Sequence, residues 1–146
     1  MAGLRLTFFC LLTCLASMES FAMELPVTVV KNFLDAMSRR DFTTMESLMA
    51  PEFKMTVSGG YVFKHPREFA AQSGKRQKSA RKTTDRYDQI PTADGGVVFA
   101  MGSMAGEWLN GTTYSGVRYI DRFEIKNGKI VDMNVWSDMS EFRPKD

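Results

Sequence analysis

Cysteine and histidine are scarce in this chain. Its 146 residues include two cysteines, Cys10 and Cys14, and one histidine, His65. Both cysteines fall in an N-terminal stretch that we predict to be removed, which leaves no thiol for a disulfide, a thiolate metal site or a nucleophile. One histidine cannot build a histidine-based catalytic triad or a multi-histidine metal site within one chain. We therefore expect neither a bound metal nor a cofactor.

Neither sign of charge dominates the sequence. Nineteen lysines and arginines face seventeen aspartates and glutamates, for a formal net charge of +2. The densest basic run, Lys75 to Lys82, has no aromatic residue on which a base would stack. We interpret it as a solvated loop leading into a polar edge strand, Thr83 to Ile90, where lysines discourage unwanted strand pairing. Nucleic acid is not an expected partner.

A hydrophobic run long enough to span a bilayer is also missing. The apolar run Leu6 to Leu15 is shorter than the roughly 20 residues that a spanning helix needs. Arg5 precedes it and Ser20-Phe21-Ala22 follows it, as in a signal peptide cleaved after Ala22. We predict an exported protein, periplasmic or secreted, with a single mature domain over residues 23–146 and no stable membrane span. A retained N-terminal anchor and a lipid attached at Cys14 are the alternatives.

Two Asn-Gly pairs divide the last third of the chain into three predicted strands. The strands run from Val97 to Trp108, Thr112 to Ile125 and Lys129 to Trp136, joined at Asn110-Gly111 and Asn127-Gly128. Asn-Gly readily supplies the positive φ values of a tight hairpin turn. The pattern predicts an antiparallel meander.

Three helices are expected ahead of the meander. The first begins at Pro26 and carries an apolar stripe at helical spacing; the second is short and ends before Pro51; the third runs from His65-Pro66 to about Gly74. A strand pair over residues 53–63 separates the second from the third. Helices that cover a curved antiparallel sheet imply an α+β cone with an apolar interior. The apolar residues of the first two helices are Val30, Phe33, Leu34, Met37, Phe42, Met45, Leu48 and Met49.

Asp121 is the most informative polar residue of the meander. A period of two places Tyr119, Asp121 and Phe123 on one face of their strand. Desolvation between two aromatic side chains would raise the pKa of this carboxyl group and let it act as acid, base or hydrogen-bond donor. The alternative is a position at the rim, paired with Arg118, Arg122 or a backbone amide.

Five short motifs follow one another along the chain: Phe33-Leu34-Asp35-Ala36, Asp41-Phe42, Leu48 to Phe53, the closing run from Tyr119 to Val131, and Trp136-Ser137-Asp138. Together with the order of the elements, they resemble the SnoaL-like and ketosteroid isomerase-like branch of the nuclear transport factor 2-like superfamily. The resemblance spans essentially the whole predicted mature chain. It implies a cone-shaped barrel in which a strongly bent, mixed but mainly antiparallel sheet wraps around three helices, and a homodimer formed through the outer sheet face.

The resemblance also implies which catalytic groups to look for. In the isomerase branch a general-base aspartate ends the first strand, and here that position falls on Val57 or Ser58, neither of which can abstract a proton from carbon. Asp121 falls close to a second aspartate that donates a hydrogen bond to an oxyanion. The helical tyrosine of that pair has no match beside Phe33. Isomerase chemistry of that kind is therefore disfavoured.

Three functions remain open on the sequence. The first is a binding protein that holds a small, mostly apolar ligand in the cone, the second is an isomerase, dehydratase or cyclase that uses Asp121 with Tyr119 or His65, and the third is an interaction module whose cavity its own side chains fill. The residues predicted to line a ligand are Phe33, Met37, Met49, Met55, Val57, Phe69, Met101, Tyr119, Phe123, Met133 and Val135.

Overall fold

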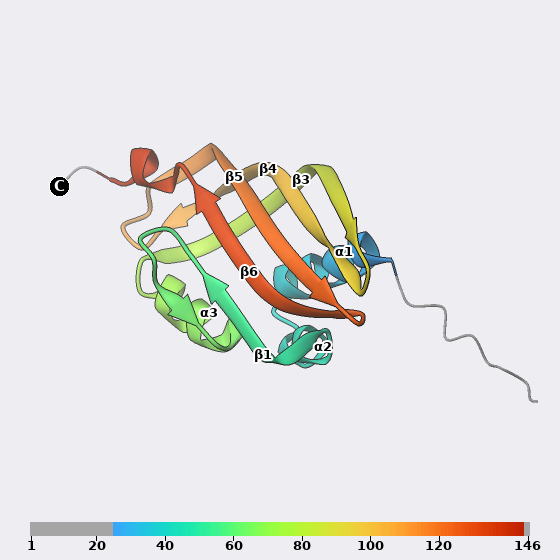
Figure 1. Ribbon diagram of the computed structural model, residues 1–146. Helices are drawn as coiled ribbons and strands as arrows, with labels where there is room; N and C mark the ends of the chain where they lie inside the picture. Colours follow the sequence, from blue (N-terminus) through green and yellow to red (C-terminus); the bar gives the residue numbers. More distant parts are fainter. Residues whose placement is uncertain (1–24, 145–146) are drawn as a thin grey trace, which may run out of the picture.

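The computed structural model describes residues 25–144 (Figure 1). The signal peptide predicted for residues 1–22 lies outside this range. The elements are, in chain order, α1 (Pro26–Ser38), α2 (Phe42–Ser47), β1 (Met49–Thr56), β2 (Val62–Phe63), α3 (Pro66–Gly74), β3 (Gln77–Thr92), β4 (Gly95–Trp108), β5 (Thr113–Lys126), β6 (Lys129–Ser137) and the 3-10 helix η1 (Met139–Phe142).

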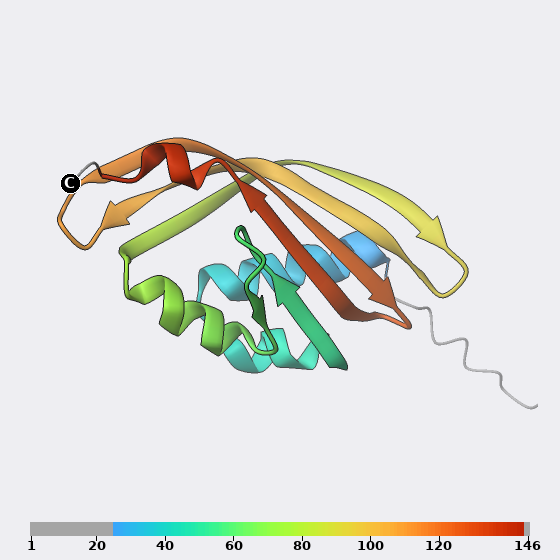
Figure 2. The same cartoon turned by 60° about the vertical axis from the view of Figure 1, so that its left-hand side comes forward.

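The strands form one bent sheet in the order β2-β1-β6-β5-β4-β3. β1 and β6 are parallel, and every other neighbouring pair is antiparallel. Figure 2 shows the helices beneath the concave face of this sheet. The sheet stays open, with β2 and β3 as its edges. The predicted α+β cone is confirmed, and no helix among residues 25–144 is long and apolar enough to cross a membrane.

Local sequence explains where the helices begin. Pro26 starts α1, because its missing N–H is not needed in a first turn. At α2 the Asp41 carboxylate accepts a hydrogen bond from the Thr44 N–H at 3.1 Å, as an N-cap residue does. At α3 Glu68 in the first turn accepts from the Lys64 N–H at 3.0 Å. The predicted starts of all three helices are confirmed.

The second helix is shorter than predicted. α2 ends at Ser47. The spacing of apolar residues predicts that Met49 belongs to this helix, but Met49 begins β1 and pairs with Ile130. The Leu48 carbonyl accepts a hydrogen bond from the Ile130 N–H at 2.9 Å. Pairing with a strand about eighty residues away therefore decides the state of this segment, which local periodicity cannot reveal.

The two Asn-Gly pairs make different turns. Asn127 and Gly128 both have positive φ, 49° and 74°, so the turn between β5 and β6 is the predicted tight one. In the other pair only Gly111 has positive φ. There the Asn110 side chain accepts from the Thr112 N–H at 3.0 Å, so this pair sits in a longer loop.

A close approach between β3 and β4 accompanies the strong bend of the sheet. The register of β3 against β4 shifts between Thr84 and Arg86, as at a β-bulge. Just before this shift the Thr83 carbonyl oxygen comes so near to Gly102 that a Cβ there would lie 1.9 Å from it. Only a residue without a side chain fits, so Gly102 lets the first half of β3 fold over β4.

Two apolar clusters fill the concave side. The inner core lies around Phe33 of α1, whose ring centroid is 5.9 Å from that of Phe123 and 6.2 Å from that of Phe53. The end cluster lies at the other end of β4 and β5, under η1. The inner core comprises Val29, Val30, Phe33, Ala36, Met45, Phe53, Met55, Val98, Ala100, Phe123, Ile125, Ile130 and Met133; the end cluster comprises Met104, Trp108, Tyr114, Val117 and Tyr119.

Gly102→Ala should destabilise the fold by about 2 kcal/mol or more, because the new methyl group meets backbone rather than a flexible side chain. Gly74→Ala is the matched control. A Cβ at position 74 meets nothing within 4 Å, so this change should leave stability equal or slightly higher. Urea unfolding of both variants measures the difference. Equal midpoints would contradict the close approach at Gly102.

Candidate functional site

Asp121 lies at the boundary between the two clusters on the concave face. Along β5 it stands between Phe123 of the inner core and Tyr119 of the end cluster. Across the sheet its register partners are Val135 on β6 and Ala100 on β4. Asp121 is fully buried, and no other charged residue among 25–144 is buried. The predicted inward position is therefore confirmed.

Lys82 supplies the counter-charge. Its Nζ forms a salt bridge and hydrogen bond with Oδ2 of Asp121. Lys82 belongs to β3, and β4 separates this strand from β5. Lys82 is the register partner of Met104, whereas Asp121 is the register partner of Ala100, so the lysine side chain runs diagonally over β4. The small residues Ala100 and Gly102 leave room for this path.

Burial controls the ionisation of Asp121. Desolvation raises the pKa of this carboxyl group above its ordinary value, and the nearby Lys82 ammonium offsets part of that rise. Oδ1, the second carboxylate oxygen, has no hydrogen-bond partner among the described residues. Because this oxygen is buried and unsatisfied, it costs stability, and a proton on it would lower that cost.

Tyr119 extends the same polar group. Its hydroxyl forms a 2.6 Å hydrogen bond with the Thr84 hydroxyl, a second link from β5 across to β3. Burial raises the pKa of Tyr119 to about 12, so the phenol stays protonated at neutral pH. Lys82 Nζ lies 4.4 Å from the centre of the Tyr119 ring, within the range of a cation–π contact. We call Lys82, Thr84, Tyr119 and Asp121 the polar cluster.

The lysine is the accessible member of the polar cluster. The side chain of Lys82 is 22% exposed, whereas Asp121 is completely buried. Every other lysine between residues 25 and 144 is exposed. A molecule on the concave face would therefore reach the amine first, with the carboxylate behind it.

Sequence reasoning missed Lys82. The run Lys75 to Lys82 was expected to be a solvated loop, but β3 already begins at Gln77. Lys82 and Thr84 alternate with outward-facing Arg81 and Thr83, which is a strand pattern hidden by polar side chains on both faces. The alternative of a rim position, with Asp121 paired to Arg118 or Arg122, is wrong. Arg118 pairs instead with Asp138, and Arg122 with Asp132 and Glu124.

The side chains predicted to line a ligand fall into three groups. Four are fully buried in the inner core: Phe33, Met55, Phe123 and Met133. A second group is half-buried and packs against the margin of that core: Met37, Met49, Val57, Phe69 and Val135. Tyr119 belongs to the end cluster and to the polar cluster. The deep end of the cone is thus filled by its own side chains, and the half-buried group remains available at its margin.

Met101 does not point inward as predicted. It pairs with the exposed Ile120 on β5 and lies on the opposite face of β4 from Val98 and Ala100. The period of two along β4 is fixed by the buried residues on either side of Gly102, and this parity directs Met101 to the convex face.

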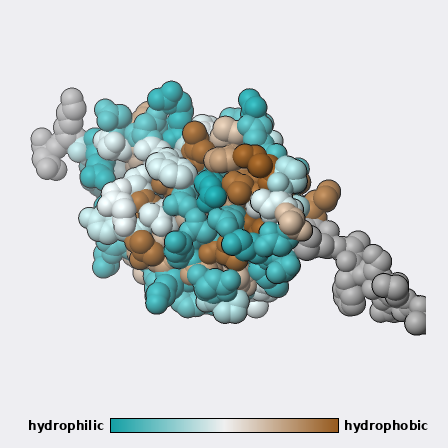
Figure 3. Space-filling model, viewed as in Figure 1, coloured by the Kyte–Doolittle hydropathy of each residue, from teal (hydrophilic) through white to brown (hydrophobic). Residues whose placement is uncertain are grey.

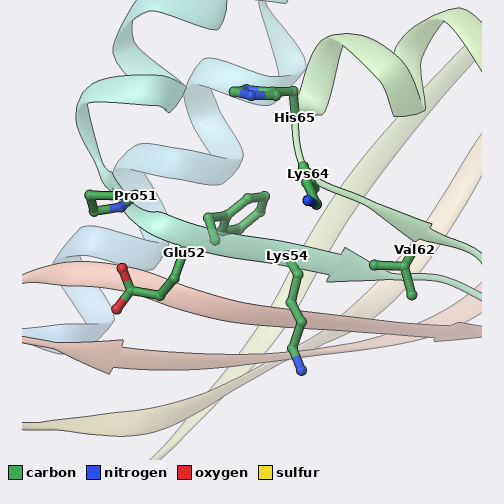
Figure 4. Close-up of a pocket in the computed structure, with 7 residues that line it drawn as sticks. Pro51, Glu52, Lys54, Val62, Lys64 and His65 are labelled. Atoms are coloured by element: carbon green, nitrogen blue, oxygen red, sulfur yellow. The ribbon is translucent and has the colours of Figure 1, made fainter.

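His65 lies in a different place from the polar cluster. It is the exposed N-cap residue of α3 and makes no side-chain capping hydrogen bond. It lines a hollow of about 310 Å³ beside β1, together with Lys64 and Glu52. An overlapping hollow of about 220 Å³ shares His65. In Figure 4, Glu52 and Lys54 extend from β1, whereas Lys64 and His65 come from the segment before α3. The structure does not bring His65 into contact with Asp121 through any hydrogen bond or ion pair.

The hollow has a simple origin. β2 pairs with β1 only at Met55 and Thr56, so the preceding residues of β1 have no neighbouring strand on that side. The residues that line the hollow carry charges of both signs. One of them, Lys54, forms a salt bridge in which its Nζ lies 3.6 Å from Oδ1 of Asp132. Residues 25–144 gather no group of three or more histidine, cysteine, aspartate or glutamate side chains that could hold a metal ion. The polar cluster differs from this hollow in holding the only fully buried charged residue among residues 25–144.

Comparison with known proteins agrees with this architecture. The family model of the SnoaL-like domain matches residues 30–133. No curated protein matches the chain in sequence.

Solved structures resemble the chain over most of its length. An NTF2-like protein of unknown function from Burkholderia pseudomallei has a TM-score of 0.67 and 17% identity, covering 80% of this chain and 93% of that one. TerC, co-crystallised with polyporic acid, has a TM-score of 0.67 and 18% identity, covering 80% and 94%. A candidate polyketide cyclase from Pseudomonas putida has a TM-score of 0.64 and 20% identity, covering 81% and 95%. At these identities the likeness establishes the fold.

Lys82→Met should destabilise the protein by about 3 to 5 kcal/mol at neutral pH, because it leaves a buried carboxylate without its counter-charge. Lys78→Met on the same strand removes the exposed pair with Glu107 and should cost about 1 kcal/mol or less. Urea unfolding of both variants and of the parent protein gives the two values.

The deficit of Lys82→Met should shrink as the pH falls. Lys82 lowers the pKa of Asp121 against the desolvation that raises it, so removing Lys82 raises the folded-state pKa further. The cost to stability builds up as the pH rises from 3.8, the ordinary value of an aspartate, to the folded-state pKa, is fully present above it and vanishes well below 3.8. Carboxylates with lowered pKa, such as Asp41 and Asp138, act oppositely but equally in both proteins. A deficit that stays constant from pH 7 to pH 4 would contradict this account.

Proposed function

Because the chain belongs to the SnoaL-like domain family, we propose that it binds a small, mostly apolar molecule on the concave face of its sheet and holds an oxygen atom of that molecule at the Lys82–Asp121 pair. The carrying observation is a fully buried carboxylate, paired with a partly accessible lysine, in the middle of an apolar face. The proposal concerns the outer part of the cone, since the inner core is filled.

The energetic cost of the pair supports a role in binding. Moving two charges out of water costs several kcal/mol per ion, and replacing such a pair by apolar side chains is often neutral or stabilising. The inner core next to Asp121 is built from apolar side chains alone. Perturbed, buried carboxylates are typical of functional sites. A binding role explains why this position carries charge at all.

The surroundings of the pair support an organic ligand with an oxygen atom. Half-buried Val135 is the register partner of Asp121, and half-buried Tyr87 pairs with Ala100 beside it. Such side chains give an apolar molecule contact area, while the lysine ammonium donates hydrogen bonds to an uncharged carbonyl or hydroxyl oxygen. The co-crystallisation of the structural neighbour TerC with polyporic acid is in keeping with this ligand class.

Catalysis is the second candidate function. It is favoured by one observation, the unpartnered Oδ1 of Asp121, which is available as a proton acceptor next to a protonated lysine. The reaction would be an isomerisation, dehydration or cyclisation, and the structural neighbour named as a candidate polyketide cyclase is in keeping with it. The position of the isomerase base stays occupied by Val57 or Ser58, so Asp121 itself would have to transfer the proton.

We also propose export after removal of residues 1–22, and one measurement tests both export and binding. The protein is purified from the exported fraction of its producing cells and weighed intact by native mass spectrometry, then denatured. We expect a chain that begins at Met23 and releases a defined small organic molecule. A chain that keeps residues 1–22 and stays in the cytoplasm would contradict export.

Two variants distinguish ligand binding from catalysis. Asp121→Asn should lose most of the retained molecule, because the amide no longer orients Lys82, while Lys78→Met should retain it fully. If Asp121→Asn also ends conversion of that molecule by the purified protein, catalysis becomes the better description. If the parent protein releases no small molecule, and no added apolar oxygen compound saturates it, an interaction module with a filled cone would be favoured.

A homodimer through the convex sheet face is a further part of the proposal. This face carries the exposed apolar pair Ile120 and Trp136, which are register partners on β5 and β6, with Met101 next to Ile120 on β4. Figure 3 shows apolar patches on the molecular surface, separated by polar side chains. Large exposed apolar side chains on adjacent strands are typical of protein interfaces.

Ile120→Glu should shift the dimer toward monomer by at least about tenfold in dissociation constant, because it places a charge in the centre of the interface. Leu109→Glu in the loop between β4 and β5 is the control, since Leu109 is also exposed but lies outside the sheet. Sedimentation equilibrium measures the dimer dissociation constant of both variants and of the parent protein. A parent protein that remains monomeric at all concentrations would refute the dimer.

A further inference from the structure

We propose that Lys82 captures an apolar aldehyde or ketone covalently, as an imine on its Nζ, with Asp121 as the proton carrier and counter-ion. The inference rests on the proposed binding function and names its ligand class. It adds a covalent step that reversible binding does not require. The observation behind it is a partly accessible amine bound to a fully buried carboxylate.

The position of Lys82 differs from that of the other lysines. Lys54, Lys78 and Lys126 also form ion pairs, but their side chains are 59%, 65% and 49% exposed, against 22% for Lys82. An exposed lysine is a hydrated ammonium ion and a poor nucleophile. Lys82 Nζ is hydrogen-bonded to a carboxylate, so the proton that must leave the amine before it attacks a carbonyl group has an acceptor already in place.

The reaction balances without an added reagent. The Lys82 ammonium gives one proton to Asp121, and the neutral amine attacks the carbonyl carbon, so that a C–N bond forms and the carbonyl oxygen takes this proton from Asp121 to become a hydroxyl group. The nitrogen of the adduct, now positively charged, gives a second proton to Asp121. Asp121 passes it to the hydroxyl group, the C–O bond breaks, water leaves, and the nitrogen lone pair forms the C=N bond. A carbonyl compound and a lysine ammonium become a protonated imine and one water molecule.

Asp121 suits this step because Lys82 carries the same charge before and after capture. The ammonium and the protonated imine each carry one positive charge, so the buried carboxylate keeps a counter-ion before and after capture. Burial, which raises the pKa of Asp121, eases the transient transfer of the proton from Lys82. Oδ2, which already holds Lys82 Nζ, is the oxygen that relays protons between the amine and the leaving hydroxyl group.

The neighbours of the amine indicate the kind of carbonyl compound. Nζ stands 4.4 Å from the centre of the Tyr119 ring, and the Tyr119 hydroxyl is already engaged with Thr84. The ring face stabilises a cation at this place, the imine included. Among residues 25–144 no arginine and no second lysine forms a hydrogen bond or ion pair with Asp121, so Lys82 is its one cationic partner there. An uncharged aromatic or aliphatic carbonyl compound fits this arrangement.

Reductive trapping tests the proposal in the folded protein. The protein is incubated separately with benzaldehyde and with decanal in the presence of sodium cyanoborohydride, and peptide mapping by mass spectrometry measures the rate of labelling at each lysine. Lys82 should be labelled about tenfold or more faster than Lys78 in the same sample. Asp121→Asn should remove this preference without changing the rate at Lys78. The comparison within the parent protein stands even if the variant does not fold.

A parallel titration with benzyl alcohol and decanol, followed by NMR, separates the two proposals. Binding of these alcohols at the concave face with no preferential labelling of Lys82 would overturn covalent capture and leave the binding function standing, with Lys82 as a neutralising partner only. Absence of both would overturn both. Preferential labelling that survives Asp121→Asn in a folded variant would refute the role of Asp121.

Discussion

The contact between the Thr83 carbonyl and the backbone of Gly102 is the constraint on which the rest of the structure depends. No side chain fits between β3 and β4 at this point, and the first half of β3 therefore folds over the concave face. Lys82 and Thr84, the residues on either side of Thr83, both bond to side chains of β5. The same stretch of β3 thus carries the close approach and half of the polar cluster, and a change at position 102 would disturb both.

The polar cluster divides the concave face into a part that serves stability and a part that is open to function. On one side of Asp121 the Phe33, Phe53 and Phe123 rings are packed and fully or nearly fully buried, as in any protein interior. On the other side Tyr119 carries a hydroxyl that needs a partner and finds one in Thr84. Asp121 stands where the apolar packing ends. The core therefore shields its carboxylate from water, while its counter-ion, Lys82, is still partly exposed to solvent.

Much of this could be predicted from the sequence, and the remainder fails for identifiable reasons. Alternation along β5 and β6 located the buried face and Asp121, because a period of two is a local property. Lys82 was missed because its inward orientation depends on a register with β4 that contains a bulge. Met49 and Met101 were misplaced for related reasons, the first by pairing with distant Ile130 and the second by the parity of β4. Long-range pairing decided each of these cases.

The pairing of one buried carboxylate with one half-buried amine also limits what the site can do. Asp121 cannot leave the apolar face without exposing the core around Phe123, and Lys82 cannot leave Asp121 without stranding a charge in that core. Any molecule that engages the cluster must therefore preserve a positive partner for the carboxylate or bring a proton to it. A neutral ligand that accepts a hydrogen bond from the ammonium meets this condition, and so does a carbonyl compound that converts the ammonium into a protonated imine. An anion that drew Lys82 away would not, and this selects for uncharged oxygen compounds over acids.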